Sequence, residues 1–214
     1  MSTKTYLTIR EPDNTFVLSD SHFDHTNVIR FDGRRNANGE PFQSAEEMNI
    51  FMVEQWNSVV RENSLVLYLG DLSMNHRIAD VIEVLNALNG RKIFIRGNHD
   101  YCFAQRPTGE LIHPEILSYV EQLRDYIECR VHYPDGLEQH VVLSHFPLFS
   151  WHWKDTKGIN PAWHLHGHCH NNLSHSTPNG YYKNDVLDVH CCKYNYIPQS
   201  FTQIREEMER KRIA

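Results

Sequence analysis

LVLYLGD, residues 65–71, is an unbroken apolar run that ends in a glycine and an aspartate. A run of this length, followed by residues that favour turns, is typical of a short buried strand. A second such run at 93–96 precedes GNHD at 97–100, and between the two runs a helical pattern near 77–88 stops at Asn89-Gly90. Strand, helix and strand in this order predict parallel pairing with a right-handed crossover.

Similar short runs lie at 15–19 and 141–143, and nearly all of them end directly at a polar cluster. The clusters are Asp20-Ser21-His22, Gly70-Asp71, Gly97-Asn98-His99-Asp100, Ser144-His145 and Gly167-His168-Cys169-His170. Because the carboxyl ends of successive strands line up along one edge of a sheet, we expect these clusters to converge in space. Nitrogen and oxygen donors without thiolate suit manganese, iron, zinc or a similar ion.

The rest of the pattern predicts one α/β domain over residues 1–214. Ser44 is placed to cap a helix, with Glu47 at the capping-box position. The apolar residues that follow, among them Met48 and Trp56, keep helical spacing and predict one buried face. Further expected features are a helical turn at 27–31, loops at 32–42 and 147–163, a helical stretch at 114–124, a hairpin of 127–133 and 138–143, short strands near 163–166 and 186–190, and a last helix at 201–212.

The composition is that of a globular protein, with 214 residues of which 40% are apolar and 22% are charged. Fifteen histidines favour a metal protein, since histidine is the commonest metal ligand. The formal net charge of -6 argues against a general nucleic-acid coat, which needs a basic face. A nucleic-acid substrate stays possible on this count, because bound divalent ions would add positive charge at the site.

Localisation follows from cysteine usage and hydropathy. The five cysteines include no C-x-x-C pair, and the amino-terminal residues lack an apolar leader. Apolar runs stay well below the roughly 20 residues that a membrane span needs. The sequence therefore predicts a cytoplasmic protein with reduced thiols and no membrane association.

The spacing within the clusters suggests how two metal ions are held. Asp20 and His22 lie two residues apart, so that period-2 geometry can point both to one side, and His168 and His170 repeat this spacing. Asp71 follows the central strand and is well placed to bridge two ions. Asn98 adds a neutral oxygen, Gly97 allows a sharp turn before it, and His145 completes the set. Two ions about 3.5–4 Å apart clamp the attacking and leaving oxygens of a displacement at phosphorus.

His99 is the histidine of these motifs that we expect not to bind metal. It precedes Asp100, and a carboxylate that is hydrogen-bonded to an imidazole fixes its tautomer and favours the protonated form. Such an imidazole can donate a proton to a leaving alkoxide, an effect worth typically about 10²–10⁴-fold in rate.

Taken together and in order, these motifs resemble the calcineurin-like metallophosphoesterases over about residues 16–198. The resemblance implies a four-layer α-β-β-α sandwich of two mixed sheets. It implies one metal on Asp20, His22, Asp71 and His170, and a second on Asp71, Asn98, His145 and His168. It also implies that His99 is catalytic and oriented by Asp100. Two divalent ions are expected, with manganese favoured and iron, zinc or nickel as alternatives.

A narrower likeness concerns DSHFDH at 20–25, SHFP at 144–147 and HLHGHCH at 164–170, which look like a compact phosphoesterase group of bacteria and their phages. That group tends to carry glycine where Asp24 stands, so an additional carboxylate here would either repel an anionic substrate or contact the metal shell. His25 and Arg30 are candidates for substrate binding, since guanidinium grips phosphate. Arg34 and Arg35 could meet a phosphate in the same way, but for all three arginines a solvated loop face is the more common role. The aromatic segment 151–153 either stacks a base or packs in the core.

The expected activity is hydrolysis of a phosphodiester or phosphomonoester, on a small nucleotide-like substrate, by a metal-bridging hydroxide with His99 assisting the leaving group. One alternative is a nuclease acting on DNA or RNA ends, which the acidic balance disfavours. Another is a non-catalytic scaffold with the same fold, which is expected to lose ligands or the catalytic histidine. Here all seven ligand positions and His99 are present.

Overall fold

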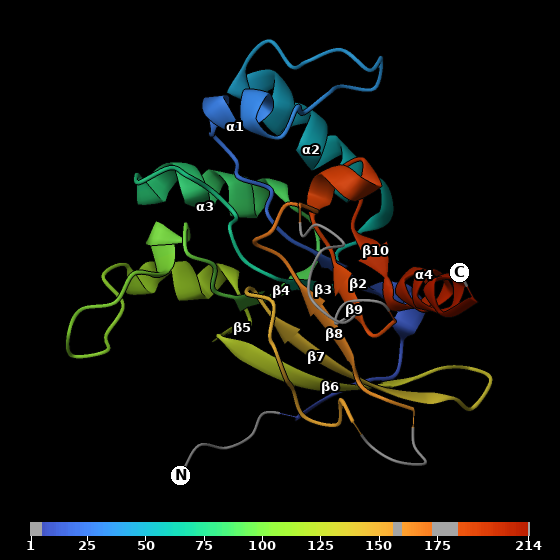
Figure 1. Cartoon of the computed structure of the whole chain (residues 1–214). Helices are drawn as coiled ribbons and strands as arrows, with labels where there is room; N and C mark the ends of the chain where they lie inside the picture. The colour runs from blue at the N-terminus through green and yellow to red at the C-terminus, as the bar shows by residue number, and fades with distance from the viewer. Residues whose placement is uncertain (1–5, 156–159, 173–183, 214) are drawn as a thin grey trace.

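The computed structural model describes residues 6–155, 160–172 and 184–213, and these form two five-stranded sheets flanked by helices (Figure 1). The first sheet has the strand order β10-β2-β3-β4-β5 and the second has the order β1-β6-β7-β8-β9. The strands are β1 (Tyr6–Ile9), β2 (Thr15–Leu18), β3 (Leu65–Tyr68), β4 (Arg91–Ile95), β5 (Gln122–Arg124), β6 (Tyr126–His132), β7 (Glu138–Ser144), β8 (Trp163–His166), β9 (Val186–Asp188) and β10 (Gln199–Ser200). The helices are α1 (Thr26–Phe31), α2 (Ala45–Val59), α3 (Ile78–Ala87) and α4 (Phe201–Ile213), with short 3-10 helices η1 (Pro12–Asn14), η2 (Tyr101–Phe103), η3 (Pro114–Tyr119) and η5 (Cys191–Tyr194).

Both sheets are mixed. In the first sheet β2, β3, β4 and β5 run parallel and β10 pairs antiparallel to β2. In the second sheet β6 and β7 form an antiparallel hairpin, while β1 pairs parallel to β6 and β8 pairs parallel to both β7 and β9. This sandwich of two mixed sheets with flanking helices confirms the α/β fold class expected from the sequence.

One hydrophobic core lies between the two sheets. Leu67 and Ile93 of the first sheet face Leu143 and Leu165 of the second, and Met208 of α4 joins them from the side. Because successive side chains of a strand point to opposite faces, the alternate residues of the first sheet face outward against α2 and α3. These helices therefore cover the outer face of the first sheet.

Among the residues that the structure describes, an irregular segment around Trp151, and no helix, covers the outer face of the second sheet. Trp151 is buried against Val142 and Val186, and its indole N–H donates to the Ala162 carbonyl at 2.8 Å. The two roles considered for the aromatic segment 151–153 are base stacking and core packing. The burial of Trp151 against the sheet corresponds to core packing. Helix α4 flanks the same sheet at its β9 edge, where Lys211 donates to the Val186 carbonyl.

Local sequence signals explain several boundaries. The Ser44 hydroxyl accepts a hydrogen bond from the Glu47 amide at 3.1 Å, as expected of a helix cap, and the Glu47 carboxylate accepts from the Gln43 amide at 2.7 Å. Helix α3 ends just before Gly90, whose φ of +87° is easily reached only by glycine.

One expected element is wrong in part. The stretch 114–124 was expected to be helical, but only Pro114–Tyr119 forms a 3-10 helix, and Gln122–Arg124 forms strand β5 on the open edge of β4. Pairing with a free strand edge outweighs the weak helical preference of so short a segment. The two-residue strand β10 and the first strand β1 were not expected at all.

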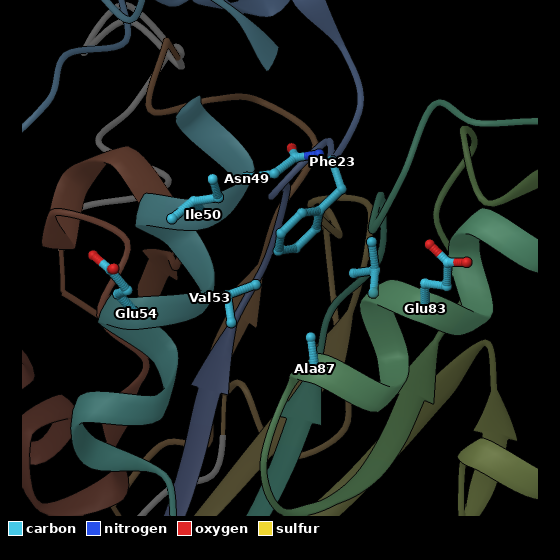
Figure 2. A pocket seen from close by; sticks show the side chains of 8 residues that line it. Phe23, Asn49, Ile50, Val53, Glu54, Glu83 and Ala87 are labelled. Carbon is cyan, nitrogen blue, oxygen red and sulfur yellow. The ribbon is translucent and has the colours of Figure 1, made fainter. Parts of the chain in front are cut away.

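Helices α2 and α3 leave a groove between them of about 350 Å³ (Figure 2). Its walls are mostly apolar, including Ile50, Val53 and Val84, and Glu54 and Glu83 also line it. Of the helices in the described ranges, none is both long enough and apolar enough to cross a bilayer.

Candidate metal centre

The carboxyl ends of five strands meet at one place, and the polar clusters of the sequence follow them. Backbone hydrogen bonds fix the segments to each other: the Asp20 amide donates to the Gly70 carbonyl at 2.9 Å and the His22 amide to the Asp71 carbonyl at 3.0 Å. From the second sheet, the Gly167 amide donates to the His145 carbonyl at 3.0 Å. The convergence expected from parallel strand ends is therefore present, and it spans both sheets.

A first group of side chains consists of Asp20, His22 and His170, whose donor atoms all lie within 4.8 Å of one another. His22 Nε2 is 3.1 Å from His170 Nε2, and His170 Nε2 is 3.7 Å from Asp20 Oδ1. Asp71 Oδ2 lies 3.7 Å from His22 Nε2 and thus borders this group.

A second group consists of Asp71, His145 and His168, again within 4.8 Å of one another. His145 Nε2 lies 3.5 Å from Asp71 Oδ2 and 3.0 Å from Asn98 Oδ1. Asp71 therefore touches both groups, in the position of a bridging carboxylate.

The spacing and the protonation of these donors fit metal ions. Ligands held about 2.0–2.2 Å from one ion lie about 3.0–3.6 Å from each other, close to the separations found here. His145 Nδ1 lies 2.8 Å from the Leu69 carbonyl, which can only accept, so we assign the ring proton to Nδ1. The Nε2 lone pair then faces oxygens of Asn98 and Asp71. Such lone pairs repel one another unless a cation lies between them.

Five of the seven candidate ligands have a left-handed backbone. The φ angles are 58° at Asp20, 51° at His22, 59° at Asp71, 68° at His168 and 47° at His170. Non-glycine residues rarely adopt such angles, and when they do they cluster at functional sites that hold them in place. This corrects the expectation that strand pleating aligns the paired ligands: they lie beyond the strands, where alternating left-handed residues point them inward.

The glycines of the motifs are needed for close packing. A Cβ on Gly97 would lie 2.1 Å from Asp71 Oδ1, and one on Gly167 would lie 2.5 Å from Asp20 Oδ2. The sequence predicts that Gly97 permits a sharp turn, but Gly97 does not have a positive φ angle. The glycine with a positive φ angle here is Gly70, which packs against Gly97 and has a φ of +91°. The role of Gly97 is to leave room for the Asp71 carboxylate.

The electrostatics of the site favour a bound cation. Burial raises the pKa of Asp20 to about 7 and also raises the pKa of Asp71, because both carboxylates lie away from water. Burial lowers the pKa of His145 to about 4 and that of His22 to about 2, so both imidazoles are neutral at pH 7. Neutral imidazoles bind metals, and a divalent ion would supply the positive charge that the buried carboxylates lack.

Asp100 does not orient His99, which corrects the sequence expectation. Its buried carboxylate accepts three backbone hydrogen bonds, from Gly97 at 2.7 Å, Leu72 at 2.8 Å and Asp71 at 3.0 Å. Asp100 therefore ties the loop after β3 to the loop after β4. His99 Nδ1 is buried and has no hydrogen-bond partner among the residues that the structure describes, and the ring lies 5.5 Å from the His22 ring.

The sequence analysis missed the support beneath the first group. Arg34 was expected on a solvated loop face, yet it is only 1% exposed. Its guanidinium donates to the Asp20 carbonyl at 2.8 Å and to the Ser21 carbonyl at 2.5 Å, and it pairs with Asp32 at 3.1 Å. Arg34 thus fixes the segment that carries two candidate ligands.

Asp32 orients His170. Its Oδ1 lies 2.8 Å from His170 Nδ1, so that the proton sits on Nδ1 and Nε2 faces the site. Burial alone would raise the pKa of Asp32, but the hydrogen bond from His170, with His190 Nε2 3.5 Å from Asp32 Oδ2 and the Arg34 cation beside it, holds this pKa well below its usual value. His190 stacks on His170 with ring centroids 4.6 Å apart. A carboxylate that is hydrogen-bonded to a candidate ligand histidine is the signal that could have identified Asp32. The sequence does not show this pairing, because Asp32 and His170 lie far apart in the chain.

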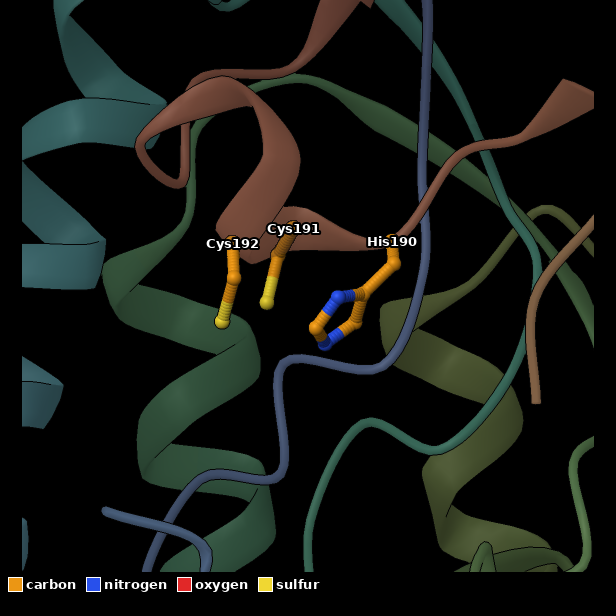
Figure 3. Close-up of side chains that lie close together, drawn as sticks. All are labelled: His190, Cys191 and Cys192. Atoms are coloured by element: carbon orange, nitrogen blue, oxygen red, sulfur yellow. The ribbon is translucent and has the colours of Figure 1, made fainter. Parts of the chain in front are cut away.

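Beside His190 lie Cys191 and Cys192, whose side chains point the same way from η5 (Figure 3). The three donor atoms lie within 4.8 Å of one another. However, the Cys191 thiol donates to the Asp20 carbonyl at 3.2 Å, and the Arg34 cation faces both cysteines. These contacts make this group part of the packing beneath Asp20.

The remaining candidates differ in position. His25 lies beside the site, with its ring 5.6 Å from that of His22. Arg30 is exposed on α1, and no contact with the described residues places it at the site. Asp24 accepts hydrogen bonds from Asn49 at 2.6 Å and Asn75 at 3.2 Å. Its carboxylate thus links the loop to α2, and neither role considered for it is supported.

The chain is similar over most of its length to several other proteins. No protein-family model matches the chain. The Gene 66 proteins of Mycobacterium phages D29 and L5 are 26% and 28% identical to it over 177 and 172 residues, which cover 77% and 73% of this chain and 82% and 77% of those proteins. The crystal structure of AQ665 from Aquifex aeolicus, a protein of unknown function, has a TM-score of 0.56 at 18% identity and covers 90% of this chain and 98% of that one, which supports the fold. The uncharacterized protein MJ1445 of Methanocaldococcus jannaschii is 30% identical over 200 residues, or 93% of each chain, and the chain therefore belongs to the family of MJ1445.

Proposed function

We propose that the protein is a dinuclear metal-dependent phosphoesterase, related to the calcineurin-like metallophosphoesterases that its motifs resemble. The observation that carries the proposal is the pair of adjacent histidine and aspartate groups that share Asp71. Asp20, His22, Asp71 and His170 would hold one divalent ion, and Asp71, Asn98, His145 and His168 the other. Manganese is the first choice, with iron, zinc and nickel as alternatives.

Two divalent ions in this place would supply Lewis-acid stabilisation of the negative charge that develops on phosphoryl oxygens. The protein contributes the geometry. Left-handed backbone at Asp20, Asp71 and His168 fixes the ligands before substrate binds, so that little reorganisation is needed during the reaction. The proposed substrate is a small nucleotide-like phosphate ester, either a diester or a monoester.

His99 is the proposed proton donor to the leaving group. It lies next to Asn98 with its ring 5.5 Å from that of His22, and its amide donates to Asp71 Oδ1 at 2.8 Å. This hydrogen bond from the amide fixes the backbone of His99 against the Asp71 carboxylate, and the imidazole would protonate an ester oxygen of the substrate. His25, whose ring lies 5.6 Å from that of His22, is a second candidate for contact with the phosphate.

The test is hydrolysis of bis-p-nitrophenyl phosphate and p-nitrophenyl phosphate by metal-stripped protein with Mn²⁺ added back. The His99→Ala variant should keep two bound ions and lose about 10²–10⁴-fold in turnover. His113→Ala, which removes a histidine paired with Glu115 on the surface, is the matched control. It should keep the two bound ions and the full turnover. The ratio of the two rates separates diesterase from monoesterase.

Two results would contradict the proposal. Full diesterase turnover in His99→Ala would remove the proton-donor role. No turnover of either ester, in protein shown to bind two ions, would favour the non-catalytic scaffold.

A further inference from the structure

A pocket of about 380 Å³ opens beside the candidate metal centre, between the loop after β4 and the loop after β7. Asn98 lines this pocket, and its side-chain oxygen lies 3.0 Å from His145 Nε2 in the second ligand group. A substrate whose phosphate sits at the metal centre would therefore project one of its substituents into the pocket. The volume is in the range of small-molecule sites, about 300–1,000 Å³.

Two exposed aromatic side chains, Tyr101 and Phe146, also line the pocket. They are 40% and 48% exposed. The Tyr101 ring stacks on His76 with centroids 4.3 Å apart, and the Phe146 ring contacts His168 at 4.7 Å. These contacts hold both rings in fixed orientations, and exposed rings of fixed orientation are what flat bases stack on.

The charge of the pocket excludes a second phosphate as its occupant. Among the described residues that line it, Arg96 carries the positive charge, and two hydrogen bonds of 2.6 Å pair its guanidinium with Asp125. A second carboxylate, that of Asp100, also lines the pocket, so no positive charge is left unpaired for an anion, and the exposed Gln105 offers an amide to a polar ring edge. A neutral heterocycle fits these features, whereas an anion would meet the Asp125 carboxylate.

We propose that this pocket binds the nucleobase of the substrate, with Tyr101 and Phe146 as its specificity-determining residues. The inference depends on the proposed function, because it places the phosphate of the same molecule at the metal centre. It predicts that nucleotides bind better than sugar phosphates that lack a base.

The experiment compares adenosine 5′-monophosphate with ribose 5-phosphate by calorimetric binding to Mn²⁺-loaded protein. The two ligands share sugar and phosphate, so the ratio of their dissociation constants measures the base alone. We expect the nucleotide to bind about tenfold more tightly or better. The ratio should fall toward one in the Tyr101→Leu, Phe146→Leu double variant. It should be kept in Tyr101→Phe and in Phe149→Leu, which removes an exposed aromatic outside the pocket. Inorganic phosphate should bind all variants equally.

Equal affinities in the unmodified protein, or a preference that survives in the double variant, would overturn the inference. Turnover of bis-p-nitrophenyl phosphate or p-nitrophenyl phosphate by the same preparations separates this failure from that of the proposed function. Turnover without a base preference rejects the pocket and keeps the phosphoesterase. A base preference without turnover supports the pocket and rejects the phosphoesterase.

Discussion

Asp71 connects the two groups of candidate ligands, and its position depends on the glycine opposite it. The Asp71 carboxylate lies 3.7 Å from His22 Nε2 and 3.5 Å from His145 Nε2. Gly97 packs against this carboxylate so closely that no other residue fits without displacing it. At the scale of single residues, the site therefore depends on glycines that leave room for the carboxylates as much as on the candidate ligands themselves.

Replacing Gly97 with alanine should disturb the metal centre more than the fold. The new Cβ would lie 2.1 Å from Asp71 Oδ1 and 2.5 Å from the Asp71 amide nitrogen, so the bridging carboxylate must move. We expect metal affinity to fall by at least about tenfold, as when ligand positioning is lost. Competition with a fluorescent chelator measures this affinity. Gly109→Ala, where a Cβ meets open space at a φ of +86°, should bind metal normally. Equal metal affinity in the two variants would contradict this role of Gly97.

The candidate ligands could be found from the sequence, but their supports could not. Each ligand follows a short, mostly apolar run within one to four residues, and this local pattern is readable. Asp32 and Arg34 lie in a loop rich in glycine and asparagine, which has the composition of an exposed turn. Their burial arises from contacts with Asp20 and His170, far away in the sequence, and no local pattern records it.

At the scale of elements, the loop after α1 acts as a buried brace for the end of β2. Arg34 reaches under this end and bonds the carbonyls of Asp20 and Ser21. It also contacts α2, with its guanidinium 3.8 Å from the sulfur of Met48. One side chain thus connects a strand end, a loop and a helix.

Arg34→Ala should destabilise the whole protein. The change removes the buried cation that pairs with the Asp32 carboxylate and a donor to two buried backbone carbonyls, and breaking such a buried pair typically costs about 3–5 kcal/mol. Chemical denaturation of the metal-free protein measures this loss. Arg35→Ala is the matched control: that exposed side chain bonds only the Gly39 carbonyl among the contacts described, and its loss should change stability by less than about 0.5 kcal/mol. Similar free energies of unfolding in the two variants would show that Arg34 does not stabilise the fold in this way.

Prediction of the elements succeeded where the pattern was long and failed at the edges of the sheets. Helices α2 and α3, the parallel strands β2, β3 and β4, and the β6–β7 hairpin all follow periodicity, caps or turn residues. Strand β5 has three residues and β10 has two, so neither carries a readable period. Each forms because a neighbouring strand offers an unpaired edge, which is a tertiary effect.

At the scale of the whole molecule, two sheets that are built from distant parts of the chain create the site. β1 pairs with β6 across more than a hundred residues, with Tyr6 opposite Glu128. Asp20, Asp71 and Asn98 follow strands of the first sheet, whereas His145, His168 and His170 follow strands of the second. The sequence predicted that the clusters converge, but which strands share a sheet became clear only from the structure.

Metal binding should couple to pH through the buried carboxylates. In the metal-free protein burial raises the pKa of Asp20 to about 7, so this residue carries a proton at pH 6 that a metal ion must displace. His22 and His145 are neutral at both pH 6 and pH 8 and add nothing to the difference. Affinity for Mn²⁺ should therefore rise from pH 6 to pH 8, with more protons released on binding at pH 6. Calorimetry in buffers of different ionisation enthalpy measures both quantities. An affinity that is flat over this range would contradict the assignment of Asp20.

The most direct measurement is the number of metal ions bound per chain, by elemental analysis of metal-stripped protein reloaded with Mn²⁺, beside the Asp71→Asn variant. Two groups of ligands that share Asp71 predict two ions in the unmodified protein. They also predict the loss of bound metal and of phosphoesterase turnover together in the variant, because Asp71 serves both groups. One ion or none in the unmodified protein, or two ions retained in Asp71→Asn, would contradict a dinuclear centre bridged by Asp71.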